Sequence, residues 1–189
     1  GNFLVAGDVG IFSETIPNGI APDVFLSLGV KPILSSMNED KCYYLDKIGK
    51  PPEVVIEIVS NREGGELTTK LETYRSIGVL YYVVYDPSNY LKKNRALMCY
   101  KFVNDRVIDM MEAWFEELGL GLHFWEGSYE EITRSWLRWK NKSGIIPTGK
   151  EAKEQTEVKL EQIQKEKELE EELKKYNEDS DASALSQDT

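Results

Sequence analysis

The sequence predicts a mixed α/β (α+β) fold, in which a central sheet contains a strand–helix–strand crossover. Short apolar runs with β-branched and aromatic residues recur through the first 149 residues, with turn residues between them. After residue 150, Glu, Lys and Gln dominate, which indicates a solvent-exposed helix. We therefore expect a folded domain at 1–149, a charged helical tail at 150–177 that could pair as a coiled coil, and a disordered end at 178–189.

The first half of the chain contains five predicted strands. They occupy residues 3–6, 9–12, 23–28, 54–59 and 81–85. The turn Pro17-Asn18-Gly19 separates the early runs, so we expect these strands to pair as an antiparallel meander. The polar stretch from Val30 to Pro52 is predicted to be a long surface excursion.

The crossover is predicted over residues 53–86. Apolar residues at helical spacing follow the strand at 54–59, from Glu66 to Ile77, and Gly78 stands where a helix would end. A strand, a helix and a second strand form a βαβ unit, so the strands at 53–60 and 81–86 should be parallel. Four further short strands are expected, at 97–103, 106–110, 120–125 and 136–139.

Composition excludes most classes of catalytic site. His123 is the sole histidine, in an alternating strand-like run, so a Ser-His-Asp triad or a multi-histidine zinc site would depend on this one residue. Cys42 and Cys99 have no metal-binding spacing, which fits a reducing compartment. No apolar stretch is long enough to cross a bilayer and no leader pattern is evident, so we expect a cytoplasmic protein. Any chemistry must therefore rest on carboxylates.

The net charge of −10 argues against nucleic-acid binding, because Lys and Arg supply most of the affinity for phosphates. The tail from residue 150 carries seven Lys and thirteen Asp or Glu, so more than half of the net negative charge of the chain lies there. A nucleic-acid enzyme would need a basic groove beside its active site. The candidates for that groove are Lys41, Lys47, Lys50, Arg62 and Arg75.

Two carboxylates and a lysine are the candidate site. Glu57 interrupts a run that otherwise indicates a buried strand, where an unpaired carboxylate would cost several kcal/mol. Asp23 begins a strand that could lie beside it, and two such carboxylates suit Mg²⁺. Lys70 lies about one helical turn past Glu66, within reach of Glu57. Each has a simpler explanation: a water-facing Glu57, a turn Asp23, and an exposed Lys70 paired with Glu66.

Several short motifs in a fixed order carry a resemblance to a known family. They are residues 21–25 (APDVF), 52–60 (PEVVIEIVS), 70–74 (KLETY), 78–79 (GV) and 81–87 (YYVVYDP). Together they resemble the Uma2 family of restriction endonuclease-like proteins, also called domain of unknown function eight-twenty. The resemblance extends through 136–139 and 146–148 and covers nearly the whole chain. It implies the restriction-endonuclease-like, PD-(D/E)XK nuclease fold.

The resemblance also implies an activity, which is Mg²⁺-dependent hydrolysis of phosphodiester bonds, with Mn²⁺ able to replace Mg²⁺. Asp23, Glu57 and the carbonyl of Ile58 would be metal ligands. Val59 stands where the family's signature has a lysine, so Lys70 on the following helix takes that role, and Glu66 is supporting. The implied partner is nucleic acid, with DNA expected ahead of RNA. A duplex substrate would suit a symmetric dimer, so we also expect a homodimer that forms through the strands or the tail. The alternative function is a non-catalytic protein-interaction module with the nuclease fold.

Overall fold

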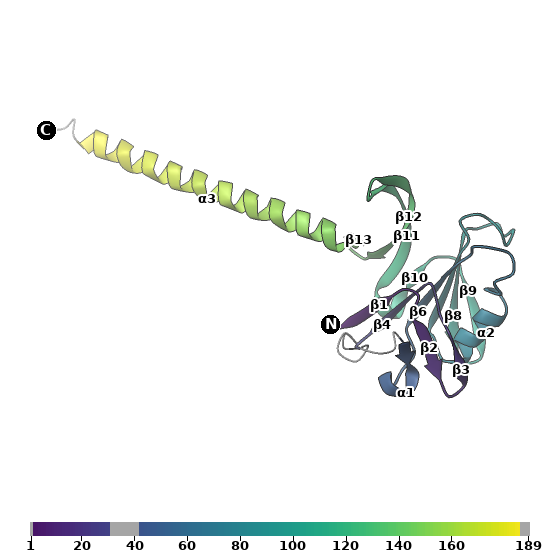
Figure 1. The fold of residues 1–189 in the computed structure, drawn as a ribbon. Coiled ribbons are helices and arrows are strands. Elements are labelled where there is room, and N and C mark those ends of the chain that lie inside the picture. The colour runs from purple at the N-terminus through teal and green to yellow at the C-terminus, as the bar shows by residue number, and fades with distance from the viewer. Residues whose placement is uncertain (1, 31–41, 186–189) are drawn as a thin grey trace. The chain divides into compact units, whose positions relative to one another are not determined.

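A six-stranded mixed sheet is the largest sheet of the structure, a computed structural model that describes residues 2–30 and 42–185 (Figure 1). β6 (Val54–Ile58) and β7 (Tyr81–Tyr85) run parallel, and α2 (Thr69–Ser76) connects them, which confirms the predicted crossover. The other neighbouring pairs in this sheet are antiparallel. In spatial order the strands are β1 (Phe3–Ala6), β4 (Val24–Leu28), β6 (Val54–Ile58), β7 (Tyr81–Tyr85), β8 (Leu97–Val103) and β9 (Arg106–Met110).

The main core lies on the face of the sheet that carries α2. Because side chains alternate along a strand, Val55 and Glu57 of β6 share this face with Tyr82 of β7, whose ring lies 5.2 Å from that of Tyr74 on α2. α2 is shorter than the predicted helix from Glu66 to Ile77, because residues 66–68 form turns before it. Gly78, with φ +87°, follows its C-terminal end, as the sequence predicted.

A second sheet of three strands corrects two predictions. β2 (Gly10–Ser13) pairs with β3 (Ile16–Ile20) and runs parallel to β5 (Cys42–Tyr44), whereas β1 pairs with β4 in the large sheet. The early strands therefore do not form one meander. The end of the stretch 30–52 is no surface excursion either, because β5 and α1 (Leu45–Ile48) form there; residues 31–41 lie outside the described residues.

Tyr43 explains why β5 belongs to the core. Its side chain is fully buried, its ring makes an edge-on contact with Phe25 at 5.1 Å, and its hydroxyl group lies 2.9 Å from Ser27 Oγ. The same hydroxyl donates to the carbonyl of Lys50 at 3.1 Å. A buried tyrosine that satisfies its polar end in this way anchors the smaller sheet to β4.

A third sheet contains the last strands in the order β10 (Trp114–Phe115), β11 (Leu120–Tyr129), β12 (Ile132–Asn141) and β13 (Gly144–Ile145). The predicted strands at 120–125 and 136–139 are present but longer, and His123 is exposed on β11 as expected. The chain divides into two compact units, Gly1–His123 and Phe124–Thr189. A short 3₁₀ helix, η2 (Glu116–Leu118), lies between β10 and β11.

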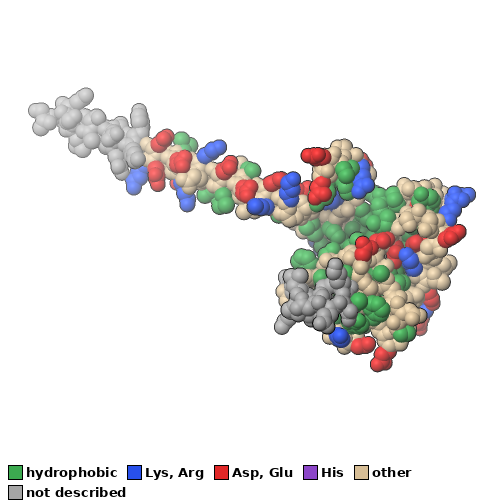
Figure 2. All heavy atoms as spheres, in the orientation of Figure 1, with side chains coloured by type: hydrophobic (Ala, Val, Ile, Leu, Met, Phe, Trp, Pro, Cys, Tyr) green, Lys and Arg blue, Asp and Glu red, His purple; other side chains and the backbone are tan. Residues whose placement is uncertain are grey.

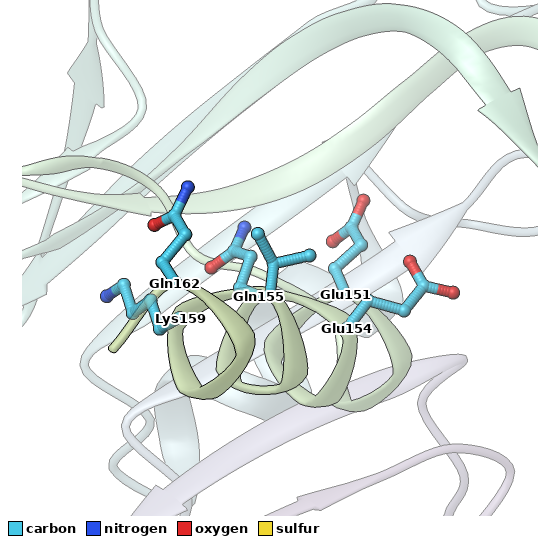
Figure 3. A pocket seen from close by; sticks show the side chains of 6 residues that line it. Glu151, Glu154, Gln155, Lys159 and Gln162 are labelled. Atoms are coloured by element: carbon cyan, nitrogen blue, oxygen red, sulfur yellow. The ribbon is translucent and has the colours of Figure 1, made fainter. Parts of the chain in front are cut away.

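The charged tail is a single helix, α3 (Gly149–Leu185), which continues beyond residue 177, where the sequence predicted its end. Figure 2 shows acidic and basic side chains intermixed along it. Side chains in its first turns line an open hollow of about 430 Å³, and five of these are labelled in Figure 3: Glu151, Glu154, Gln155, Lys159 and Gln162. Such a mixture is typical of a solvated helix. Within the described residues, no helix combines the length and apolar character needed to cross a membrane.

Replacing Tyr43 with Phe should lower the free energy of unfolding by about 1–2 kcal/mol, because Ser27 loses its buried hydrogen-bond partner. Chemical denaturation of the purified protein measures this loss. The control is Tyr90→Phe, at a tyrosine that is 37% exposed, which should change the stability by less than about 0.5 kcal/mol. An equal effect of the two substitutions would contradict the anchoring role of Tyr43.

Candidate metal and hydrolase site

Glu57 is the buried centre of the candidate site. It lies one residue before the end of β6, with 1% of its surface exposed, on the face of the sheet that α2 covers. The strand around it consists of Val and Ile residues, which favour a strand buried between two layers. A carboxylate in such a strand must find partners of its own, since burial removes its hydration.

Two side chains of α2 supply those partners. Lys70 Nζ lies 2.7 Å from Glu57 Oε2, and the hydroxyl group of Tyr74 donates to Oε1 at 2.6 Å. Lys70 and Tyr74 are four residues apart, so they project from the same face of the helix. Both oxygens of Glu57 therefore accept a hydrogen bond from one helix, which holds α2 in register with β6.

Asp23 lies beside Glu57 at the same edge of the sheet. It precedes Val24, which pairs with Ile56, so the antiparallel register of β4 and β6 brings Asp23 opposite Glu57. The backbone N–H of Ile58 donates to Asp23 Oδ2 at 2.5 Å. This bond fixes the Asp23 carboxylate, and Oδ1 accepts no hydrogen bond from the part of the chain that the structure describes. One oxygen of Asp23 is thus available to a ligand.

Glu66 is a third carboxylate next to Lys70. It is 5% exposed, its Oε1 lies 3.6 Å from Lys70 Nζ, and its buried Oε2 has no hydrogen-bond partner among the described residues. Its backbone carbonyl accepts a hydrogen bond of 2.9 Å from Tyr82. Gly64 closes over it so tightly that a Cβ atom at Gly64 would collide with the carboxylate. Glu66 is therefore held in place with one oxygen unsatisfied.

Burial and the contacts with Lys70 and Tyr74 have opposite effects on the pKa of Glu57. Burial raises its pKa above the ordinary value, and the hydrogen bonds from Lys70 and Tyr74 offset only part of that effect. Burial disfavours the charged form of Lys70, but the hydrogen bond and the attraction of Glu57 outweigh it, so the pKa of Lys70 is raised. Burial also raises the pKa of Tyr74, which keeps its proton. Lys70 is consequently a cationic donor and not a base.

The structure brings Asp23, Glu57 and Lys70 together, as the sequence analysis expected. Ile58 contributes its N–H to Asp23, and the role of its carbonyl as a ligand stays a prediction. Among the described residues, no three His, Cys, Asp or Glu side chains are grouped closely enough to hold a metal by themselves. A metal here would bind two carboxylates and complete its coordination with backbone carbonyl, water or substrate oxygens, which is usual for Mg²⁺.

Two further residues belong to the site. Tyr74, one helical turn after Lys70, packs against the sheet and also donates to Glu57; the sequence favoured the packing and left the hydrogen bond open. Glu66 was assigned a supporting role as a helical partner of Lys70, but no local pattern indicates that it is buried.

Comparison with known proteins agrees with this geometry. The model of the Uma2 family, described as "Putative restriction endonuclease", matches residues 1–108, which is more than half of the chain. The chain belongs to the Uma2 family. The match is shorter than the nearly complete resemblance expected from the motifs, but it includes Asp23, Glu57 and Lys70. No curated protein and no solved structure matches the chain. The Uma2 fold here is a restriction-endonuclease-like α+β fold, and the family is one of nucleases.

Replacing Lys70 with Met should raise the pKa of Glu57 further, because the variant loses the cation and donor that favour its charged form. Carboxyl-carbon NMR titration of the two proteins measures this shift. A raised pKa means that the folded state holds the proton more tightly than the unfolded state. Stability should therefore fall as the pH rises above about 4.5, and more steeply in the variant than in the wild type. An unchanged Glu57 pKa would contradict the ion pair.

Proposed function

We propose that this Uma2 protein is an Mg²⁺-dependent endonuclease that hydrolyses phosphodiester bonds of nucleic acid, with DNA as its substrate. Asp23, Glu57 and the Ile58 carbonyl would hold the ion, and Mn²⁺ could replace Mg²⁺. The observation that carries the proposal is the pair of carboxylates on neighbouring strands, with the buried ion pair between Glu57 and Lys70 at its centre. The family description supports the same reaction class.

The charges of the site fit a divalent cation. Asp23, Glu57 and Glu66 surround one ammonium group, that of Lys70, so the ionised cluster carries an excess of negative charge. The unsatisfied oxygen of Glu66 and the unpaired Oδ1 of Asp23 are acceptors that a cation could occupy. Carboxylate oxygens are hard donors that favour Mg²⁺ over softer metals, and a second positive charge nearby would offset the cost of burying them.

The residues of the site would have different roles in the reaction. When bound, Mg²⁺ supplies Lewis-acid activation of the phosphate and lowers the pKa of a bound water. Lys70 stays cationic and can donate a hydrogen bond to that water or to a phosphate oxygen, which orients the attack and stabilises developing charge. Tyr74 holds Glu57 in one rotamer, and the N–H of Ile58 does the same for Asp23. Fixed ligands of this kind reduce the reorganisation needed during the reaction.

A second candidate function is supported by the basic residues. Of the four described cations expected to form a groove, two are neutralised, because Lys50 pairs with Glu53, and Arg75 pairs with Glu72 and with Asp105. Lys41 lies outside the described residues. Cations that are already neutralised attract phosphates weakly, which favours a non-catalytic module that binds protein partners. A homodimer is compatible with either function, since two copies of the site would suit a duplex substrate.

Isothermal titration of Mg²⁺ tests the metal site directly. Wild-type protein should bind the ion, and the Asp23→Ala, Glu57→Ala double variant should bind it at least tenfold more weakly, because the variant lacks both ligands. The matched control is Glu14→Ala, Asp46→Ala, which removes two exposed carboxylates and changes the net charge equally. Loss of binding in the control as well would mean that Mg²⁺ responds only to overall charge.

Cleavage of a labelled duplex tests the reaction. With Mg²⁺ present, Lys70→Ala should lower the single-turnover rate by about 10²-fold or more, since a positioned donor is lost from the transition state. The control is Lys142→Ala, at an exposed lysine in the turn between β12 and β13. Mg²⁺ binding without cleavage of duplex or single-stranded DNA or RNA would favour the non-catalytic module.

A further inference from the structure

A hollow of about 490 Å³ opens beside α2, on the face of the sheet that carries the candidate site. We propose that this hollow, the Tyr100 pocket, binds one nucleobase of a single nucleic-acid strand next to the site of hydrolysis. The proposal rests on the proposed function, because it assigns a subsite for the same substrate. The volume lies within the range of pockets that hold small organic groups. Its lining includes Leu67, Leu71, Lys93, Asn94, Met98 and Tyr100.

The pocket offers an aromatic ring between apolar walls. Tyr100 of β8 is half-buried, and its ring stacks on Tyr82 with 6.3 Å between centroids. Tyr82 is itself fixed, since its hydroxyl group donates to the carbonyl of Glu66. Leu71 of α2 and Met98 of β8 supply apolar surface around the ring. A planar base has the shape and the π-face that a preorganised aromatic residue binds, whatever its sequence.

The polar edge of the pocket is positive, although the protein as a whole is acidic. Arg95 forms an ion pair with Asp109, so these two charges cancel. Lys93 is exposed and has no ion pair among the described residues, which leaves one free cation at the edge. Asn94 adds an amide that can both donate and accept, as the edges of bases require. A base with its attached phosphate complements this combination.

The pocket and the candidate site share one helix and one preceding turn. Leu71 follows Lys70, and Leu67 follows Glu66, so the Cα atom of each of these two leucines lies about 3.8 Å from the Cα atom of a residue of the candidate site. Lys93 and Asn94 lie in the loop after β7, which begins at the same edge of the sheet as the loop after β6, because these strands are parallel. Asp86 accepts the N–H groups of Tyr90 and Leu91 and orders that loop. A bound base would therefore place its strand beside Lys70.

Fluorescence anisotropy tests the pocket without catalysis. A labelled single-stranded DNA 12-mer, and one of equal length in which abasic residues replace the bases, are titrated with protein in EDTA. The variants are Leu71→Trp, which fills the pocket, and Lys93→Glu, which reverses the exposed charge. Lys142→Glu is the matched control, with the same charge change at an exposed lysine in the turn between β12 and β13. Circular dichroism and thermal unfolding establish that each variant is folded.

Wild-type protein should bind the normal 12-mer at least about fivefold more tightly than the abasic one, since stacking of one base contributes at least that factor. Leu71→Trp and Lys93→Glu should each weaken binding by about fivefold to tenfold, and Lys142→Glu by less than twofold. Equal binding of both oligonucleotides, or folded pocket variants that bind like wild type, would overturn the proposal. So would wild-type protein that binds neither oligonucleotide. The proposed function fails on a different result, the absence of Mg²⁺ binding or of cleavage, so the two failures are distinguishable.

Discussion

The contact between Lys70 and Glu57 links the chemistry of this protein to its fold. Glu57 lies near the end of a buried central strand, and its ionised form is stabilised there by the lysine and tyrosine of α2. The same two contacts define where α2 crosses the sheet, and they therefore couple the crossover connection to the candidate site. Removing one partner would leave a charge unpaired in the core, which is more costly than the net value of the pair.

Much of the central unit could be predicted from sequence because its local patterns agree with its tertiary environment. The runs around Val55 and Val83 are continuous and β-branched, and both strands are buried on two faces. The helix between them shows the spacing that brings Lys70 and Tyr74 to one side. Val59 stands where the family's signature has a lysine, which indicates that the cation must come from another element. In the structure Lys70 of the helix lies beside Glu57.

Other features depend on contacts between segments far apart in the sequence. Tyr43 lies in a polar stretch with weak strand signals, and only its contacts with Phe25 and Ser27 make it part of the core. Glu66 is buried by its close approach to Gly64 and by the turn that Tyr82 stabilises. The extent of α3 was underestimated because its polar composition resembles that of a disordered segment.

The close approach of Gly64 to Glu66 limits how this turn can vary. Any residue other than glycine at position 64 would push its side chain against a carboxylate that is already enclosed. A shift of that carboxylate would change its 3.6 Å contact with Lys70 Nζ without changing any of the charged residues. Gly64 carries no charge, yet it helps to decide where a charged group of the site lies.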